Sequence, residues 1–450
     1  MVNPHWKDDP DYLLYRPIIH KGRGAYLLGG ALVAIFFWTM VMYSRQLSLG
    51  LGVTGLNRPI SWGFYIVNFV FFIGISHAGT LISAILRLSK AEWRRPITRM
   101  AEVITAIVLA IGGLHPIIDL GRPDRLLNIF YYGRLQSPLL WDVTAITSYF
   151  TASTVYLYLP MIPDIARLRD MGVRPRWLYQ FLAWGWTGTQ RQKEILERAI
   201  TILMVLVIPI AVSVHTVISF IFSMTLQPGW HSTIFGPYFV VGAIFSGIAA
   251  ILVVMSVFRK VFHLEGYLKP IHFRYLGTLL LIMSLLWFYF TFAEYLTGFY
   301  GGEPHEMKTI LFKLKGEYAP FFWTMVTFNF LIPVVILFNR RLKTVTGVTV
   351  ASMAVIVGMW LERLNIVVPS LASPRLPVPH QIYVPSLVEW ALFIAGLTMF
   401  ALAFLLFSKF FPVISVWEIQ EGRKEGLEAV KRRIITYQPE AGATKGNRDI

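Results

Sequence analysis

The stretch LHPIIDLGRPDR, residues 114–125, ends a long apolar run with a histidine, two carboxylates and two arginines. In a helix, His115 and Asp119 are one turn apart and share a face. The apolar run is typical of a membrane-spanning helix, so its charged end falls near one edge of a bilayer. Ionisable groups at that depth are costly to bury, which indicates a function. The alternative is that Asp119 and Arg122 only cap the helix end and meet the lipid headgroups.

The composition is that of an integral membrane protein. Of the 450 residues, 55% are hydrophobic and 15% are charged, and the mean hydropathy is +0.57. A soluble core of this size could not hide so much apolar surface. The net charge of +16 would suggest a nucleic-acid partner for a soluble protein. Here the basic residues fall in loops between apolar runs, so we expect an all-α protein in a lipid bilayer and no nucleic-acid partner.

The chain contains about ten apolar runs, each close to the roughly 20 residues that a bilayer requires. Most of the 41 Lys and Arg residues lie in the N-terminal arm, every second loop and the C-terminal tail. By the positive-inside rule both termini are cytoplasmic, and an even number of spans agrees. We expect no cleavable signal peptide, because the residues before the first run are polar and aromatic. The runs cover residues 25–44, 61–86, 99–119, 140–163, 198–223, 233–258, 273–299, 319–339, 345–367 and 385–408.

A weak internal repeat groups these spans. The second span opens with WGFY at 62–65 and the sixth with FGPY at 235–238, while SPLLW at 137–141 leads the fourth and APFFW at 319–323 the eighth. The repeat predicts two four-helix bundles, spans two to five and six to nine, with the first and last spans peripheral. Chance similarity among span entrances is the alternative. The predicted segments are 1–60, cytoplasmic arm and first span; 61–223, first bundle; 233–367, second bundle; 368–410, last span; and 411–450, cytoplasmic tail.

Ionisable side chains within the spans lie mostly near the outer ends of their helices. The depth follows from the orientation that the basic loops predict. Some of these residues, Asp142 and Glu389 above all, are expected only to meet the membrane surface. The outer group comprises His115, Asp119, Asp142, Glu294, Glu362, Arg363 and Glu389, and a sparse inner trail comprises His77, His215 and Glu102.

The residue types exclude several cofactors. The chain has no cysteine, which rules out disulfides, c-type haem attachment and cysteine-ligated iron–sulfur clusters within it. Only His77, His115 and His215 lie within spans, one per helix, without the paired spacing on one helix that a di-haem bundle usually shows. No two histidines share a helical face with a carboxylate at ligand spacing, so we expect no haem and no metal site.

Three function classes fit this constellation. Quinol oxidation needs an apolar slot, a histidine or carboxylate that accepts the hydroxyl proton, and a second acid that passes protons to water. His115, Asp119 and Glu294 supply such groups. A secondary transporter uses similar groups, but its charges should gather near the bilayer midplane. A structural anchor is the third class, and it leaves the adjacent Glu362 and Arg363 within a span unexplained.

Three motifs, in order, resemble a known family. DLGRP at 119–123, with His115 before it, resembles the signature of the NrfD/polysulfide-reductase membrane subunits. SHAGTLISA at 76–84 and MWLERLNIVVP at 359–369 resemble the branch found in alternative complex III. Within that complex the resemblance points to the ActC-like subunit, and the ActF-like subunit is the nearest alternative.

The resemblance implies a quinol-oxidising subunit of the bacterial inner membrane, with menaquinol favoured. Its electrons would pass to a periplasmic iron–sulfur subunit and then to multihaem and monohaem c-type cytochrome subunits, beside an ActF-like second membrane subunit. Proton translocation is a further implication. The implied quinol or proton ligands are His77, His115 and Asp119; Arg122 would order the loop against the partner; Glu362 and Arg363 would form a polar edge from the second bundle. Asp142 and Glu294 are added as cofactor-binding candidates on depth alone, and Glu102 and His215 as steps on a proton path.

Overall fold

The computed structural model describes residues 11–19, 22–375 and 381–437, and this part of the chain is helical without any strand. Nine of the helices described are long and apolar enough to cross a membrane. The expected all-α membrane architecture is therefore confirmed. The nine are α2 (Arg23–Leu49), α3 (Phe64–Leu88), α4 (Thr98–Asp119), α9 (Gln190–Ser223), α10 (Phe235–Val261), α11 (Pro270–Gly301), the α13–α14 segment (Ala319–Phe338), α15 (Val345–Leu371) and α16 (Leu387–Phe410).

The remaining expected span, 140–163, corresponds to α6 (Pro138–Tyr158). It is long enough to cross a bilayer, but its Thr, Ser and Tyr residues make it less apolar than the nine. The hydroxyls of Thr147 and Thr151 each donate to a carbonyl one turn back at 2.8 Å. Such bonds satisfy polar side chains within a helix in lipid. Because α6 packs against α4 and α9, it completes the first bundle.

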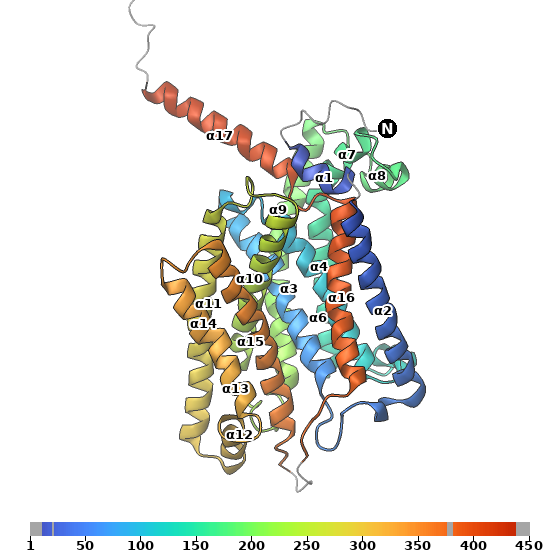
Figure 1. The fold of residues 1–450 in the computed structure, drawn as a ribbon, viewed down its shortest axis with the longest axis vertical. Coiled ribbons are helices and arrows are strands. Elements are labelled where there is room, and N and C mark those ends of the chain that lie inside the picture. Colours follow the sequence, from blue (N-terminus) through green and yellow to red (C-terminus); the bar gives the residue numbers. More distant parts are fainter. Residues whose placement is uncertain (1–10, 20–21, 376–380, 438–450) are drawn as a thin grey trace, which may run out of the picture.

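The helices form two bundles and a peripheral pair (Figure 1). The first bundle consists of α3, α4, α6 and α9, and the second of α10, α11, α13–α14 and α15. The bundles meet where α3 packs against α10 and α15. Helices α2 and α16 pack against each other, and α16 also packs against α4. This arrangement confirms the two four-helix bundles with peripheral first and last spans.

Glycines allow α3 and α4 to approach closely. A Cβ at Gly79 would lie 1.9 Å from the Ala101 carbonyl oxygen, and a Cβ at Gly112 would lie 2.7 Å from Ile73 Cδ1. Small residues are the usual means by which membrane helices approach this closely. The glycine of the SHAGTLISA motif therefore fixes α3 against α4.

A π-helical turn, Thr327–Leu331, joins α13 (Ala319–Val326) to α14 (Ile332–Phe338). Pro333 has no N–H to donate to the carbonyl of Asn329, four residues earlier. The hydroxyl of Ser284 on α11 donates to that carbonyl instead, at 2.6 Å. An unsatisfied backbone group is costly in lipid, so this bond compensates for the proline and ties α11 to the broken helix.

The short helices gather at the two ends of the bundles (Figure 1). We call one end the α17 end; it carries α1 (Tyr12–Ile19), α7 (Ile162–Asp170), α8 (Arg176–Leu182) and α17 (Val416–Tyr437). The opposite end, which we call the α12 end, carries α12 (Pro304–Leu314). The other short elements are η2 (Leu51–Val53), η3 (Glu92–Arg94), η4 (Pro123–Arg125), α5 (Asn128–Tyr131) and η5 (Leu159–Met161).

Ion pairs hold α17 against the loops of the first bundle. Glu418 near its start pairs with Arg87 and Arg94. Asp164 of α7 pairs with Arg99 and also accepts the backbone N–H groups of residues 416 and 417. These bonds stabilise the first turn of α17 by placing a carboxylate at its amino end.

Candidate functional site

The structure divides the predicted site residues into separate groups. His115 and Asp119 lie at the end of α4, where α2, α3 and α16 surround them. His77 and His215 meet between α3 and α9. Glu294 and Glu362 line a cavity of the second bundle whose lining includes neither His115 nor Asp119. We expected one polar edge shared by both bundles, but the structure shows two separate polar sites, one in each bundle.

His115 is a buried base with a free acceptor atom. Its Nδ1 lies 2.9 Å from the carbonyl oxygen of Ile111, one turn earlier. A carbonyl only accepts, so Nδ1 carries the proton and Nε2 keeps its lone pair in the neutral ring. The side chain is 2% exposed, and its Nε2 has no hydrogen-bond partner among the residues that the structure describes. The Phe72 ring, 5.4 Å away, forms one apolar wall beside it.

Asp119 is the last residue of α4 and carries a second unpartnered atom. Its Oδ1 is buried and has no hydrogen-bond partner within the described ranges. Two neighbouring helices are tied to this point by hydrogen bonds. Gln46 of α2 donates to the Ile118 carbonyl at 3.0 Å and accepts the Tyr65 hydroxyl of α3 at 2.5 Å. We call His115, Asp119, Gln46 and Tyr65 the α4-end cluster.

Glu389, expected to meet only the membrane surface, is instead fully buried. It caps α16, since it accepts the backbone N–H of Ser386 at 2.8 Å. It also accepts the N–H of Gly55 at 2.7 Å and the Tyr383 hydroxyl. Its bonds thus fasten α16 and the 50–60 loop beside the α4-end cluster. Asp142 is likewise buried, on α6, and its Oδ1 lacks a partner in the part of the chain described.

Arg122 lies on the surface beyond the α4-end cluster. Its side chain is 62% exposed and pairs with Asp124 at 3.0 Å. The loop that follows exposes several large apolar side chains at the same end of the molecule. They are Leu127, Phe130, Tyr131, Tyr132 and Leu135.

The inner histidines meet in the middle of the protein. The ring centroids of His77 and His215 are 3.9 Å apart, and the Tyr149 ring lies 6.3 Å from His77. Neither ring nitrogen of His77 has a hydrogen-bond partner in the described structure. The sequence places His77 near the middle of its span and His215 somewhat outside the middle of its own, and the structure shows that the two rings meet.

Arg363 of α15 lies where the two bundles meet. It forms an ion pair with Glu362 at 2.6 Å, and its guanidinium carbon lies 5.0 Å from the centre of the Phe239 ring. Glycines make room for this side chain: a Cβ at Gly242 would come within 2.9 Å of its Nη2, and one at Gly74 of α3 within 3.5 Å. Both charges of the pair are almost completely buried, which makes loss of one partner costly, on the order of 3–5 kcal/mol.

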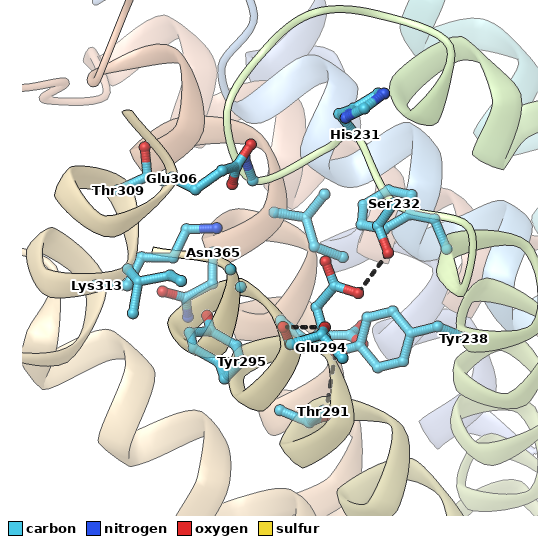
Figure 2. Close-up of a pocket in the computed structure, with 18 of the residues that line it drawn as sticks. His231, Ser232, Tyr238, Thr291, Glu294, Tyr295, Glu306, Thr309, Lys313 and Asn365 are labelled. Atoms are coloured by element: carbon cyan, nitrogen blue, oxygen red, sulfur yellow. Dashed lines mark hydrogen bonds between the residues drawn. The ribbon is translucent and has the colours of Figure 1, made fainter. Parts of the chain in front are cut away.

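A cavity of about 280 Å³ opens in the second bundle near the α12 end (Figure 2). Glu294 accepts the Ser232 hydroxyl at 2.6 Å, and Glu362 accepts Nε1–H of Trp287 at 2.9 Å. We call it the second-bundle cavity. Several of its polar residues were not predicted: Tyr238, Tyr295, Glu306, Lys313 and Asn365. Two of them carried a signal: Tyr238 is the last residue of FGPY in the repeat, and Asn365 lies in the MWLERLNIVVP motif.

Lys313 of α12 has an unusual environment in this cavity. Burial lowers the pKa of its ammonium to about 8, although Glu294 and Glu306 attract the charge and oppose the shift. We expect half-maximal acetylation of Lys313 near pH 8, rather than near the ordinary lysine value of 10.5, as followed by mass spectrometry. Exposed Lys315 is the control for reagent reactivity, and Glu306→Gln should lower the midpoint further because it removes an attraction. A midpoint near 10.5 would contradict the prediction.

Glu102 lies on α4, toward the α17 end. It accepts the Ser83 hydroxyl at 2.9 Å, and Ser83 lies 3.4 Å from the Tyr156 hydroxyl. All three side chains are buried between α3, α4 and α6. Glu102 therefore belongs to a row of buried polar side chains inside the first bundle, Ser83, Glu102 and Tyr156, and does not lie at a membrane surface. We call this row the polar column.

Comparison with known proteins identifies similar chains. Residues 52–374 match the family model described as polysulphide reductase, NrfD. A putative membrane subunit of a dimethyl sulfoxide reductase from Halobacterium salinarum is 28% identical over 55% of this chain, which spans 55% of that relative. An Hdr-like menaquinol oxidoreductase integral membrane subunit of Archaeoglobus fulgidus is 24% identical over 84% of this chain and 91% of the relative. A menaquinone reductase integral membrane subunit of Nitratidesulfovibrio vulgaris is 22% identical over 86% of this chain and 92% of the relative.

Proposed function

Because this chain belongs to the polysulphide reductase NrfD family, we propose that it is the quinol-oxidising membrane subunit of a multi-subunit oxidoreductase. One observation carries the proposal: His115 Nε2 and Asp119 Oδ1 are buried without partners in the described chain, one turn apart, at the end of α4. Buried polar atoms normally have partners, so an unpaired set points to a ligand. The relatives include subunits named for menaquinol and menaquinone, which favours redox chemistry over transport or simple anchoring.

The chemistry follows from the α4-end cluster. A quinol must lose two protons as it gives up two electrons, and its hydroxyls bind best to acceptors. His115 Nε2 accepts one hydroxyl proton, and the Asp119 carboxylate accepts the other or passes it to water. Phe72 beside His115 provides an apolar wall for the ring. The electrons leave to a redox group held by a partner, and we propose a periplasmic iron–sulfur subunit.

We propose that the α17 end faces the cytoplasm, because the basic loops lie there, and that the α12 end faces the periplasm of a bacterial inner membrane. The finer assignment is the ActC-like subunit of alternative complex III. This assignment implies c-type cytochrome subunits and an ActF-like membrane subunit as partners, and menaquinol as the substrate. The motifs at 76–84 and 359–369 support this assignment.

The exposed loop after α4 is the proposed docking surface for the iron–sulfur subunit. We expect Arg122→Glu to reduce co-purification of that subunit at least tenfold. A partner surface that is complementary to an arginine would repel a glutamate at the same position. Arg340→Glu, the same charge reversal at an exposed arginine at the α17 end, is the control and should leave the complex intact. Undiminished co-purification with Arg122→Glu would remove this loop from the interface.

Photolabelling tests the proposed quinol site. An azido-menaquinone analogue added to the intact complex should label residues 64–72 or 111–125, because these segments border the α4-end cluster. Excess menaquinone should suppress the label. Labelling confined to other parts of this chain, or suppression by no quinone, would overturn the proposed site.

We also propose a proton route through the interior. Glu362 and Arg363 lie at one end, and the His77–His215 pair follows between the bundles. The Thr105 and Tyr149 hydroxyls both donate to the Ser76 carbonyl beside His77, at 2.8 and 3.1 Å. Closer to the α17 end come Ser83, Glu102 and Tyr156. Such chains of buried hydroxyls, histidines and carboxylates are typical of proton relays in membranes.

A further inference from the structure

We propose that the second-bundle cavity is a second quinone-binding site, with the ring in the cavity and the isoprenoid tail in a lipid-facing groove between α9 and α10. This inference rests on the proposed function, in which the α4-end cluster binds the first quinone. Three independent features of the second bundle carry it: its repeat relation to the first, the groove that adjoins its cavity, and the charge of that cavity.

The cavity occupies the place in the second bundle that the α4-end cluster occupies in the first. Tyr65 and Tyr238 end the repeated WGFY and FGPY sequences at the start of α3 and α10. The next span of each bundle then carries a carboxylate toward the α12 end, Asp119 on α4 and Glu294 on α11. Tyr65 is joined to the end of α4 through Gln46, which accepts the tyrosine hydroxyl and donates to the carbonyl of Ile118, the residue before Asp119. Tyr238 lines the same cavity as Glu294. The repeat therefore places a tyrosine and a carboxylate together twice.

A groove adjoins the cavity on the side of α9 and α10. It has a volume of about 1030 Å³ and is lined by residues of α9, α10 and the segment between them. His231 and Ser232 line both the groove and the cavity. The cavity alone is slightly smaller than the roughly 300–1,000 Å³ of typical ligand pockets, so it holds a ring but not a long tail. The groove supplies an apolar wall for that tail through Val212, Phe220, Met224, Pro237, Val240 and Val241.

The charged side chains that line the cavity favour a ligand with an uncharged headgroup. The ammonium of Lys313 faces two carboxylates, Glu294 and Glu306 (Figure 2). The other two carboxylates of the lining form ion pairs, Glu303 with Arg375 and Glu362 with Arg363. With both carboxylates ionised, the cavity carries one more negative than positive charge, which repels the phosphate of a phospholipid. A quinone or quinol head is neutral, and its oxygens can pair with the ammonium and with the tyrosine and asparagine side chains.

Two glycines on the walls have room for a Cβ and are positions at which the site can be blocked. A Cβ at Gly301, on the cavity wall, would meet open space, and a Cβ at Gly236, on the groove wall, would meet only Ser219 Oγ at an ordinary 3.6 Å. Because these glycines line the two spaces, Gly301→Phe is designed to fill the cavity and Gly236→Leu to narrow the groove. Gly30→Phe is the matched control, because Gly30 lies on α2 with equally open space around it.

The experiment is azido-menaquinone labelling of the intact complex, with adducts mapped by mass spectrometry. We expect a second label within residues 229–241 or 291–313 of the unmodified chain. Gly301→Phe and Gly236→Leu should each reduce it at least tenfold, while labelling at 111–125 and in the Gly30→Phe control persists. Quinone extracted per complex should fall by one equivalent with Gly301→Phe.

Two results would overturn the second site. One is labelling at 111–125 with none in the second bundle. The other is a phospholipid, identified by native mass spectrometry, that is lost from the complex with Gly301→Phe while the quinone content stays unchanged. Labelling in the second bundle alone would instead contradict the quinol site at the α4-end cluster, on which the proposed function rests. It would leave the cavity as a quinone site, so the two failures are distinguishable.

Discussion

Asp119→Asn is expected to lower kcat for quinol oxidation by about 10²- to 10⁴-fold in the intact complex, the range typical of a lost general base. The amide is nearly the same size as the carboxylate but cannot accept the proton. Because Oδ1 of Asp119 has no partner in the described chain, the substitution breaks no hydrogen bond at that atom. The complex should therefore assemble, and the loss should appear in steady-state turnover with a water-soluble quinol.

His115→Gln should have an effect of similar size for a related reason. The glutamine amide can keep a bond to the Ile111 carbonyl, but it is not a base. Asp170→Asn is the matched control, since that carboxylate is exposed at the α17 end, where it pairs with Arg169. Wild-type turnover by a fully assembled Asp119→Asn or His115→Gln complex would remove that residue from the reaction.

The spans themselves could be predicted from the sequence because apolar length is a local property. Nine of the ten expected runs form long apolar helices. The tenth run forms α6, which is less apolar because it contains hydroxyl side chains that donate to carbonyls of the preceding turn. The placement of His115 and Asp119 on one face of α4 was also predictable, since positions i and i+4 share a helix face. The polar partners Gln46 and Tyr65 were not, because they arrive from α2 and α3 through tertiary packing.

Depth along a span does not reveal the direction in which a side chain points around the bundle. For this reason the sequence grouped Glu294 and Glu362 with Asp119, whereas the structure places them in the second-bundle cavity. The same limit applies to Glu389, which caps a helix, and to Arg363, which lies where the bundles meet. Lys313 lay outside every predicted span, and only the folding of α12 over the cavity made it a lining residue.

Glu102→Gln is expected to abolish proton translocation while quinol oxidation continues. Glu102 is buried between Ser83 and Tyr156, far from the α4-end cluster at the other end of the same helix. A glutamine keeps a hydrogen bond to Ser83 but cannot exchange a proton, so the relay is interrupted at one point only. Protons released by the complex in liposomes, followed with a pH-sensitive dye, should then equal those from the quinol alone.

The control for Glu102→Gln is Glu92→Gln, an exposed carboxylate at the same end of the first bundle, which should pump normally. If the relay passes through the paired histidines, His77→Phe should have the same effect as Glu102→Gln, and combining the two changes should add nothing. Each substitution alone already stops proton transfer along a single linear route, so the double variant cannot lose more. Full translocation in the Glu102→Gln complex, at a normal rate of quinol oxidation, would show that protons bypass this column.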